Sequence, residues 1–237
     1  MCRTELAHGN TPGIGQAAQR FVAALRAFED FAGDVAPSPV FLGSGRQGFA
    51  GPIEGDLHIG QSAEVEAFRD HASSPSCRGV AVPDLVVYNA SGRARGAFLE
   101  LVAADVANAI AVSAFGGFLV AQQAAKRMLP NKRGAILFTG ASASVKGYPQ
   151  SAPFAMGKFA LRGLAQSMAR ELSPQGIHIA HFVIDGGIRS AARTEAPDRP
   201  DSMLDPDAIA LSYWNVLQQP RSAWTWELEL RPWVEKF

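Results

Sequence analysis

GAILFTGASASVKGYPQSAPFAMGKFALRGLAQSMARELSPQGIHIAHFVIDGGIRS, residues 134–190, contains two short apolar runs on either side of a helical pattern. The first run, 135–139, has the length and composition of a buried strand. Residues 154–172 carry apolar side chains at helical spacing, and the Ser-Pro-Gln-Gly sequence at 173–176 ends that helix. Residues 177–184 form the second run. Because strand, helix and strand follow one another, we expect two parallel strands joined by a crossover helix.

The same alternation extends toward the N-terminus. Residues 85–88, Leu-Val-Val-Tyr, predict a short buried strand, and a helical pattern follows from about 103 to 128, where Pro130 stops it. The 237 residues, 47% of them hydrophobic, are enough for one large domain with a sizeable core. We therefore predict an α/β fold over residues 1–237 as a single domain. Its doubly wound parallel sheet lies between helices, in three layers.

The first third of the chain has a weaker pattern. Residues 26–52 contain many Gly, Pro and Ser residues, and Val40-Phe41-Leu42 is the one strand-like run there. Ahead of them lies a glycine-rich turn, Gly9-Asn-Thr-Pro-Gly13-Ile14-Gly15, and a helix is expected after it. Glycines at this spacing let a backbone approach a pyrophosphate, whose charge the helix N-terminus favours. An ordinary loop is the alternative, because such a turn alone is weakly diagnostic.

The composition of the chain indicates which kinds of partner are not expected. The chain has 22 Lys and Arg against 22 Asp and Glu, so nucleic acid, which requires clustered basic residues, is not expected as a partner. No apolar run of about 20 residues indicates a membrane span. Cys2 and Cys77 form neither a Cys-x-x-Cys pair nor a metal-ligand spacing with the five histidines. We therefore expect a reduced, cytoplasmic protein without a metal site or a membrane partner.

Several short motifs follow one another along the chain. After the glycine turn come Asp56-Leu57, Asn89-Ala90, Phe154-Ala-Met-Gly-Lys158 and Asp185-Gly-Gly-Ile-Arg-Ser190. In this order they resemble the motifs of the short-chain dehydrogenase/reductase family, with Phe154 in place of the tyrosine of Tyr-x-x-x-Lys. The resemblance covers about residues 9–190, and residues 204–210 and 224–231 resemble the family's closing helix and strand. It implies a Rossmann-like, dinucleotide-binding domain.

The resemblance assigns a set of residues to the cofactor, NAD or NADP. They are Gly9, Gly13, Ile14, Gly15, Asp56, Leu57, Asn89, Ala90, Lys158, Gly186, Ile188 and Ser190. In the family, the lysine hydrogen-bonds the nicotinamide ribose, and the loop that matches residues 185–190 lines the nicotinamide pocket. The choice of cofactor stays open, because Asp34 favours NAD by its position and Arg46 favours NADP by its charge.

The resemblance also implies four catalytic positions, at Lys158, Ser142, Phe154 and Ser113. Phe154 and Lys158 share one helix face, on which the family lysine lowers the pKa of the tyrosine phenol. A phenylalanine ring has no proton to transfer. Ungapped counting places the family serine at Ala141, and one residue more in the loop places it at Ser142, unless these serines only bond the backbone. Ser113 stands where the family asparagine helps to kink the preceding helix.

Two functions fit these residues. The first is an NAD(P)-dependent oxidoreductase for a carbonyl or alcohol substrate, with reduced or altered catalysis, in which Ser142, a water or Tyr148 handles the proton. The second is a non-catalytic dinucleotide-binding or scaffold protein of the same fold. The retained Lys158 favours the first, and the missing phenol favours the second. With either function, the resemblance implies a homodimer or homotetramer that forms through the two long helices, 103–128 and 154–172.

Residues 26–52 show no clear second strand and helix where the family has them. One explanation is a degenerate segment, or one that is read out of frame in the gene. Resequencing the gene tests this explanation, and a normal strand–helix unit at these positions would disprove it.

Overall fold

One mixed sheet organises the part of the chain that the computed structural model describes, which is residues 40–43 (backbone only), 83–190 and 192–236. The strands lie in the order β1-β2-β3-β4-β5. They are β1 (Val40–Gly43), β2 (Leu85–Tyr88), β3 (Ala135–Thr139), β4 (His178–Ile184) and β5 (Glu227–Leu230). The helices are α3 (Ala103–Ile110), α4 (Gly116–Met128), α5 (Ala152–Leu172) and α6 (Pro206–Leu217). Short 3-10 turns occupy Phe98–Glu100, Leu129–Asn131, Ser142–Ser144, Ser173–Gln175 and Arg221–Ala223.

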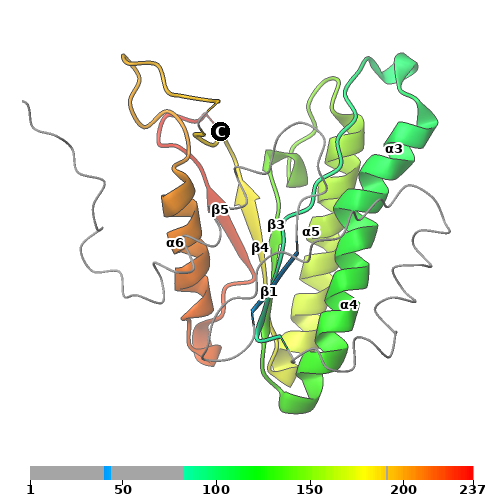
Figure 1. Ribbon diagram of the computed structural model, residues 1–237, viewed down its shortest axis with the longest axis vertical. Coiled ribbons are helices and arrows are strands. Elements are labelled where there is room, and N and C mark those ends of the chain that lie inside the picture. Colours follow the sequence, from blue (N-terminus) through cyan, green and yellow to red (C-terminus); the bar gives the residue numbers. More distant parts are fainter. Residues whose placement is uncertain (1–39, 44–82, 191, 237) are drawn as a thin grey trace, which may run out of the picture.

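Helices cover both faces of the sheet. Figure 1 shows α3, α4 and α5 on one face and α6 on the other. Side chains alternate between these layers, so that Val86 and Tyr88 pack with α4 and α5, whereas Leu85 and Val87 pack with α6. Every residue of β2 and β4 is buried, as expected for strands that are covered on both sides. The predicted three-layer architecture is confirmed.

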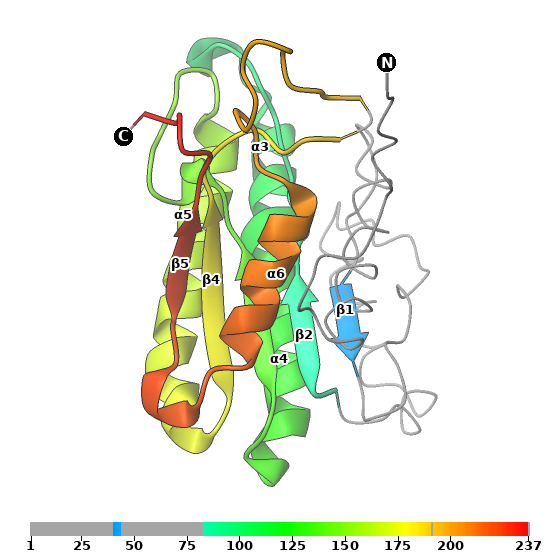
Figure 2. The same ribbon diagram turned by 90° about the vertical axis from the view of Figure 1, so that its left-hand side faces the viewer.

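Strands β2 to β5 run parallel, as the sequence predicts. β1 departs from the prediction of an all-parallel sheet, because it pairs antiparallel with β2 (Figure 2). The register places Val40 opposite Tyr88. Within the described residues β1 has a neighbour on one side only. An edge strand can pair in either direction without breaking a second ladder, and otherwise parallel sheets often carry one antiparallel edge strand.

The long helix that the sequence predicts over 103–128 has an irregular middle. A single π-turn, Ala111–Phe115, separates α3 from α4, and Ser113 lies at its centre. Such turns interrupt α-helices mostly as single units and often lie at functional sites. The continuous apolar segment Ala103–Asn131 is long enough to cross a membrane, but only by length and composition. Here α4 packs on the sheet through residues such as Val120, Ala121 and Met128.

The predicted helix at 154–172 begins two residues earlier than expected, at Ala152, because Pro153 fits the first turn of a helix. Tight packing then fixes α5 against the π-turn. A side chain on Gly157 would place its Cβ 2.7 Å from the Cβ of Ser113. The closing helix α6 is capped by Asp205, whose Oδ1 accepts a hydrogen bond from the Asp207 amide at 2.9 Å.

Candidate functional site

The sequence-predicted site residues that the structure describes gather at the carboxyl ends of the parallel strands, the upper end in Figure 1. Ligands of open α/β sheets bind at this edge, because the loops that follow neighbouring strands meet there. The contributing segments follow β2, β3 and β4 and continue into the first turns of α5. Gly9, Gly13, Ile14, Gly15, Asp56 and Leu57 lie outside the described residues, as do Asp34 and Arg46.

Lys158 is the buried cation of this edge. Its side chain leaves the first half of α5, is 2% exposed, and donates a hydrogen bond from Nζ to the Thr139 carbonyl oxygen at 2.8 Å. Burial, and after it the charge of Arg93, lower the pKa of Lys158 to about 7. An ammonium with such a pKa can gain and lose its proton near neutral pH.

Phe154 lies one helical turn before Lys158 and is partly buried. The Arg93 guanidinium lies over its ring, with Cζ 4.3 Å from the ring centroid, which is a cation–π geometry. Arg93 follows the turn after β2, and the sequence analysis did not select it. Its signal was an Arg-Ala-Arg sequence directly after the Asn89–Gly92 turn, at the end of a buried strand.

Ser113 joins the π-turn to the loop after β2. It is fully buried, and its Oγ accepts a hydrogen bond from the Gly92 amide at 2.9 Å and donates to the Gly92 carbonyl at 3.3 Å. Gly92 must be small, because a Cβ there would lie 2.7 Å from the Ala109 Cα. Ser113 therefore positions the Asn89–Gly92 turn, and through this turn Arg93.

The loop serines take different positions in the 3-10 turn Ser142–Ser144. Ser144 is fully buried, and its Oγ lies 3.3 Å from His181 Nε2 and accepts a hydrogen bond from the Ala141 amide at 3.2 Å. Ser142 is partly exposed and bonds the Val145 and Lys146 amides through its backbone carbonyl. Its hydroxyl has no partner among the described residues, so Ser142 remains the candidate for contact with a ligand.

His181 and Glu227 extend this contact into a chain of polar groups that leads from the buried His181 to the partly exposed Arg162. His181 Nδ1 lies 3.1 Å from Glu227 Oε2, and Arg162 holds both oxygens of Glu227 at 2.6 and 2.7 Å. A carboxylate can only accept, so Nδ1 carries the proton and Nε2 accepts from Ser144 Oγ. Burial lowers the pKa of His181 to about 4, although Glu227 partly opposes the shift. These contacts give the buried His181 ring a partner at each nitrogen.

The loop after β4 is fixed by charge. Asp185 is buried, and its Oδ2 forms ion pairs with Lys146 at 2.8 Å and with Arg231 at 3.7 Å. Gly186 has φ 154°, and a side chain there would collide with Pro232. Ile188 and Ser190 continue the loop through backbone bridges to Leu204 and Arg193. This loop and the Asn89-Ala90 turn border the same edge of the sheet.

Two polar groups of this edge fit a ligand that carries hydroxyl groups. The Ser91 hydroxyl is buried without a hydrogen-bond partner. The Lys158 ammonium has three protons and, among the described residues, one acceptor. A nicotinamide ribose matches such donors, with Lys158 as the residue that would hold it.

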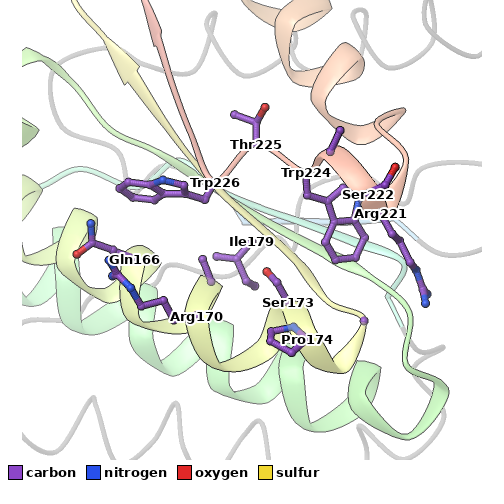
Figure 3. A pocket seen from close by; sticks show the side chains of 13 residues that line it. Gln166, Arg170, Ser173, Pro174, Ile179, Arg221, Ser222, Trp224, Thr225 and Trp226 are labelled. Atoms are coloured by element: carbon purple, nitrogen blue, oxygen red, sulfur yellow. The ribbon is translucent and has the colours of Figure 1, made fainter.

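A hollow of about 720 Å³ lies at the opposite end of the strands. Figure 3 shows its lining by the last turns of α5, including Gln166 and Arg170, and by the segment that leads into β5, including Trp224 and Trp226. Trp224 stacks on His178, with ring centroids 4.6 Å apart. None of the predicted site residues lines this hollow, so it is separate from the candidate site.

The sequence profile of the short chain dehydrogenase family matches residues 52–200, more than half of the chain. The chain belongs to this family. Its matches to curated relatives are partial: short chain aldehyde dehydrogenase 1 of Euphorbia lathyris is 40% identical over 68 residues, which are 29% of this chain and 24% of that protein. The matched segments span 24% to 38% of the length of three such relatives.

Solved structures share the fold over a larger part of the chain. A short-chain dehydrogenase from Rhodopseudomonas palustris is 35% identical, with a TM-score of 0.54 over 72% of this chain and 68% of that one. An alcohol dehydrogenase from Thermococcus sibiricus, in complex with 5-hydroxy-NADP, has a TM-score of 0.60 at 20% identity over 72% of each chain. Another structure of this fold holds NADH. With the family match, these complexes support NAD or NADP as the cofactor.

Proposed function

We propose that this chain is an NAD(P)-dependent oxidoreductase that moves a hydride between the cofactor and a carbonyl or alcohol substrate. The observation that carries the proposal is Lys158, a buried lysine at the carboxyl edge of the sheet, on the α5 face it shares with Phe154. A surface lysine would be solvated and would keep its ordinary pKa, whereas burial and Arg93 lower that of Lys158 to about 7.

The cofactor, when bound, supplies the hydride, and the chain's residues handle the proton. In the direction of reduction, the carbonyl carbon takes the hydride and its oxygen takes a proton. Phe154 stands where the family has its tyrosine and has no proton to give. We propose that Lys158 supplies the proton, directly or through a water that Ser142 holds. Tyr148 is 49% exposed on its loop, and its hydroxyl has no described contact with Lys158.

Phe154→Tyr is the direct test of altered proton transfer. Restoring a general acid–base group is expected to raise kcat by about 10²-fold or more, since such groups typically contribute ~10²–10⁴. The measurement is a titration of NADH and NADPH by fluorescence, followed by turnover on a panel of carbonyls and alcohols. Phe98→Tyr is the matched control, because it adds the same hydroxyl to a ring that is 77% exposed and lies outside the proposed helix contact. An unchanged kcat in a folded Phe154→Tyr protein saturated with cofactor would contradict the proposal.

A non-catalytic binding protein of the same fold is the second candidate, and the missing phenol is the observation in its favour. It predicts saturable cofactor binding without turnover in the natural protein. Turnover that follows the concentration of the natural protein would exclude it.

We also propose a homodimer or homotetramer in which α4 and α5 form the contact. Large apolar side chains are exposed on these two helices and at the end of the π-turn before α4: Phe115, Phe118, Met156 and Phe159. The rings of Phe115 and Phe118 stack, with centroids 6.0 Å apart. Size-exclusion chromatography with light scattering is expected to show an oligomer, and Phe118→Glu is expected to shift it toward the monomer. A monomeric natural protein would exclude this interface.

A further inference from the structure

Three arginines form a basic cluster at the candidate site: Arg93 and Arg95 on the loop after β2, and Arg193 on the loop after β4. Burial lowers the pKa of Arg93, and the charges of Arg95 and Arg193 lower it further. Arg93 in turn lowers the pKa of Lys158. The positive charges of Arg93 and Arg193 are thus close enough to influence each other, although their loops, after β2 and after β4, are far apart in the sequence.

The cluster is held in place on both sides. The Arg93 guanidinium lies over the Phe154 ring. The Arg193 backbone is paired with Ser190 through hydrogen bonds of 2.9 and 3.1 Å. A Cβ on Gly187 would lie 3.9 Å from Arg193 Nη1, so this guanidinium lies beside the loop that follows β4.

Three carboxylates of this edge already have other partners. Asp185 pairs with Lys146, and Asp205 pairs with Arg189 at 2.7 Å. Glu195 accepts hydrogen bonds from the backbone amides of residues 201 and 203. Within the described residues, Arg93, Arg95 and Arg193 have no ion pair with a carboxylate. All three side chains are exposed, and a surface of one charge sign attracts ligands of the opposite sign.

We propose that Arg93 and Arg193 bind an anionic group of the substrate, and that the substrate is a carbonyl or alcohol compound bearing a carboxylate. The inference rests on the proposed function, since it places the substrate beside Phe154 and Lys158. A guanidinium binds a carboxylate through two parallel N–H donors. Arg93 and Arg193 are exposed and therefore accessible to a ligand, and the Phe154 ring fixes where the Arg93 guanidinium lies.

The test compares each of two oxo acids with its own methyl ester. Pyruvate and 4-oxopentanoate carry the carboxylate at different distances from the ketone, and esterification removes the charge alone. Isothermal titration calorimetry measures their affinities for the full chain, with and without NAD or NADP. At least one acid is expected to bind about ten- to a hundredfold more tightly than its ester, as charged hydrogen bonds of ~1.5–3 kcal/mol imply.

Arg93→Gln and Arg193→Gln are expected to remove this preference for the acid. Arg170→Gln, an exposed arginine at the far end of α5, is the matched control and should keep it. Equal affinity of acid and ester, binding of neither, or a preference that survives both substitutions would overturn the proposal.

A separate titration distinguishes a second source of the anion. If Arg93→Gln weakens NADP or NAD binding but leaves the acid preference intact, the cluster binds a cofactor phosphate and the proposal is wrong. Failure of the proposed function is recognised differently, as an absence of cofactor binding and turnover. The acid preference can be measured in the absence of cofactor in that case.

Discussion

The two polar regions of this protein differ in how their charged groups are paired. In the chain from Ser144 through His181 and Glu227 to Arg162, each polar group has a partner within 3.3 Å. Around Phe154, by contrast, Arg93, Arg95, Arg193 and Lys158 act on one another without a carboxylate among the described residues. Complete pairing fixes a structure, whereas exposed arginines that lack a carboxylate partner are open to an anionic ligand.

Removing the Lys158 cation from the region around Phe154 should lower activity without lowering stability. Lys158→Met is expected to reduce kcat/KM by about 10²–10⁴, the usual contribution of a proton-transferring group. Its melting temperature should stay the same or rise, because burial already disfavours this ammonium. Lys126→Met, on the exposed face of α4, is the control. A Lys158→Met protein with full activity and lower stability would show that Lys158 stabilises the fold and is not needed for catalysis.

The paired region should make stability depend on pH. The folded pKa of His181, about 4, lies below the ordinary 6.5, so the unfolded chain binds its proton first as the pH falls. Stability is therefore complete above about pH 6.5 and declines toward pH 4, by on the order of 3 kcal/mol.

Urea denaturation between pH 4 and 7.5 measures this loss. His181→Gln should flatten the curve in that window. Burial raises the pKa of Glu227, but the hydrogen bonds and charges of Arg162 and His181 together outweigh it, so the pKa is lowered. An equal slope in both proteins would show that another group governs the acid transition.

A smaller effect is expected from the carboxylate of the same chain. Glu227→Gln keeps the shape but weakens the contacts with Arg162 and His181, and should cost about 1–3 kcal/mol of unfolding free energy. Cofactor affinity should not change, since Glu227 acts inside the fold. Glu229→Gln on the same strand is the control, because its side chain is exposed. Weaker cofactor binding in Glu227→Gln at unchanged stability would link the two regions.

Much of the fold followed from local pattern. The apolar runs at 85–88, 135–139 and 177–184 predicted β2, β3 and β4 within one residue. Lys158 and Ser113 could be selected because each lies in a motif, and both are buried at the carboxyl edge. The direction of β1 could not be predicted, since four residues carry no information about which way they pair.

The rest of the site depends on contacts between distant residues. His181 and Glu227 are 46 positions apart, and neither lies in a motif that announces the other. The turn before Arg93 places it over Phe154, which is 61 positions later in the sequence (154 − 93). A single arginine in a loop belongs to no periodic pattern, so the sequence does not single it out. Ser142 and Ser144 have similar neighbours in the sequence. The 3-10 turn buries Ser144 and leaves Ser142 partly exposed, which the sequence alone does not indicate.

Because of the π-turn at Ala111–Phe115, the geometry of the site depends on how many residues this helix contains. Each residue of an α-helix turns the next by about 100°, and a π-turn contains one residue more than an α-turn. The side chains of α4 are therefore out of phase with those of α3. Deleting one residue from the turn would restore a regular helix and rotate Ser113 away from Gly92. The Asn89–Gly92 turn thus depends on the number of residues in this helix as well as on their kind.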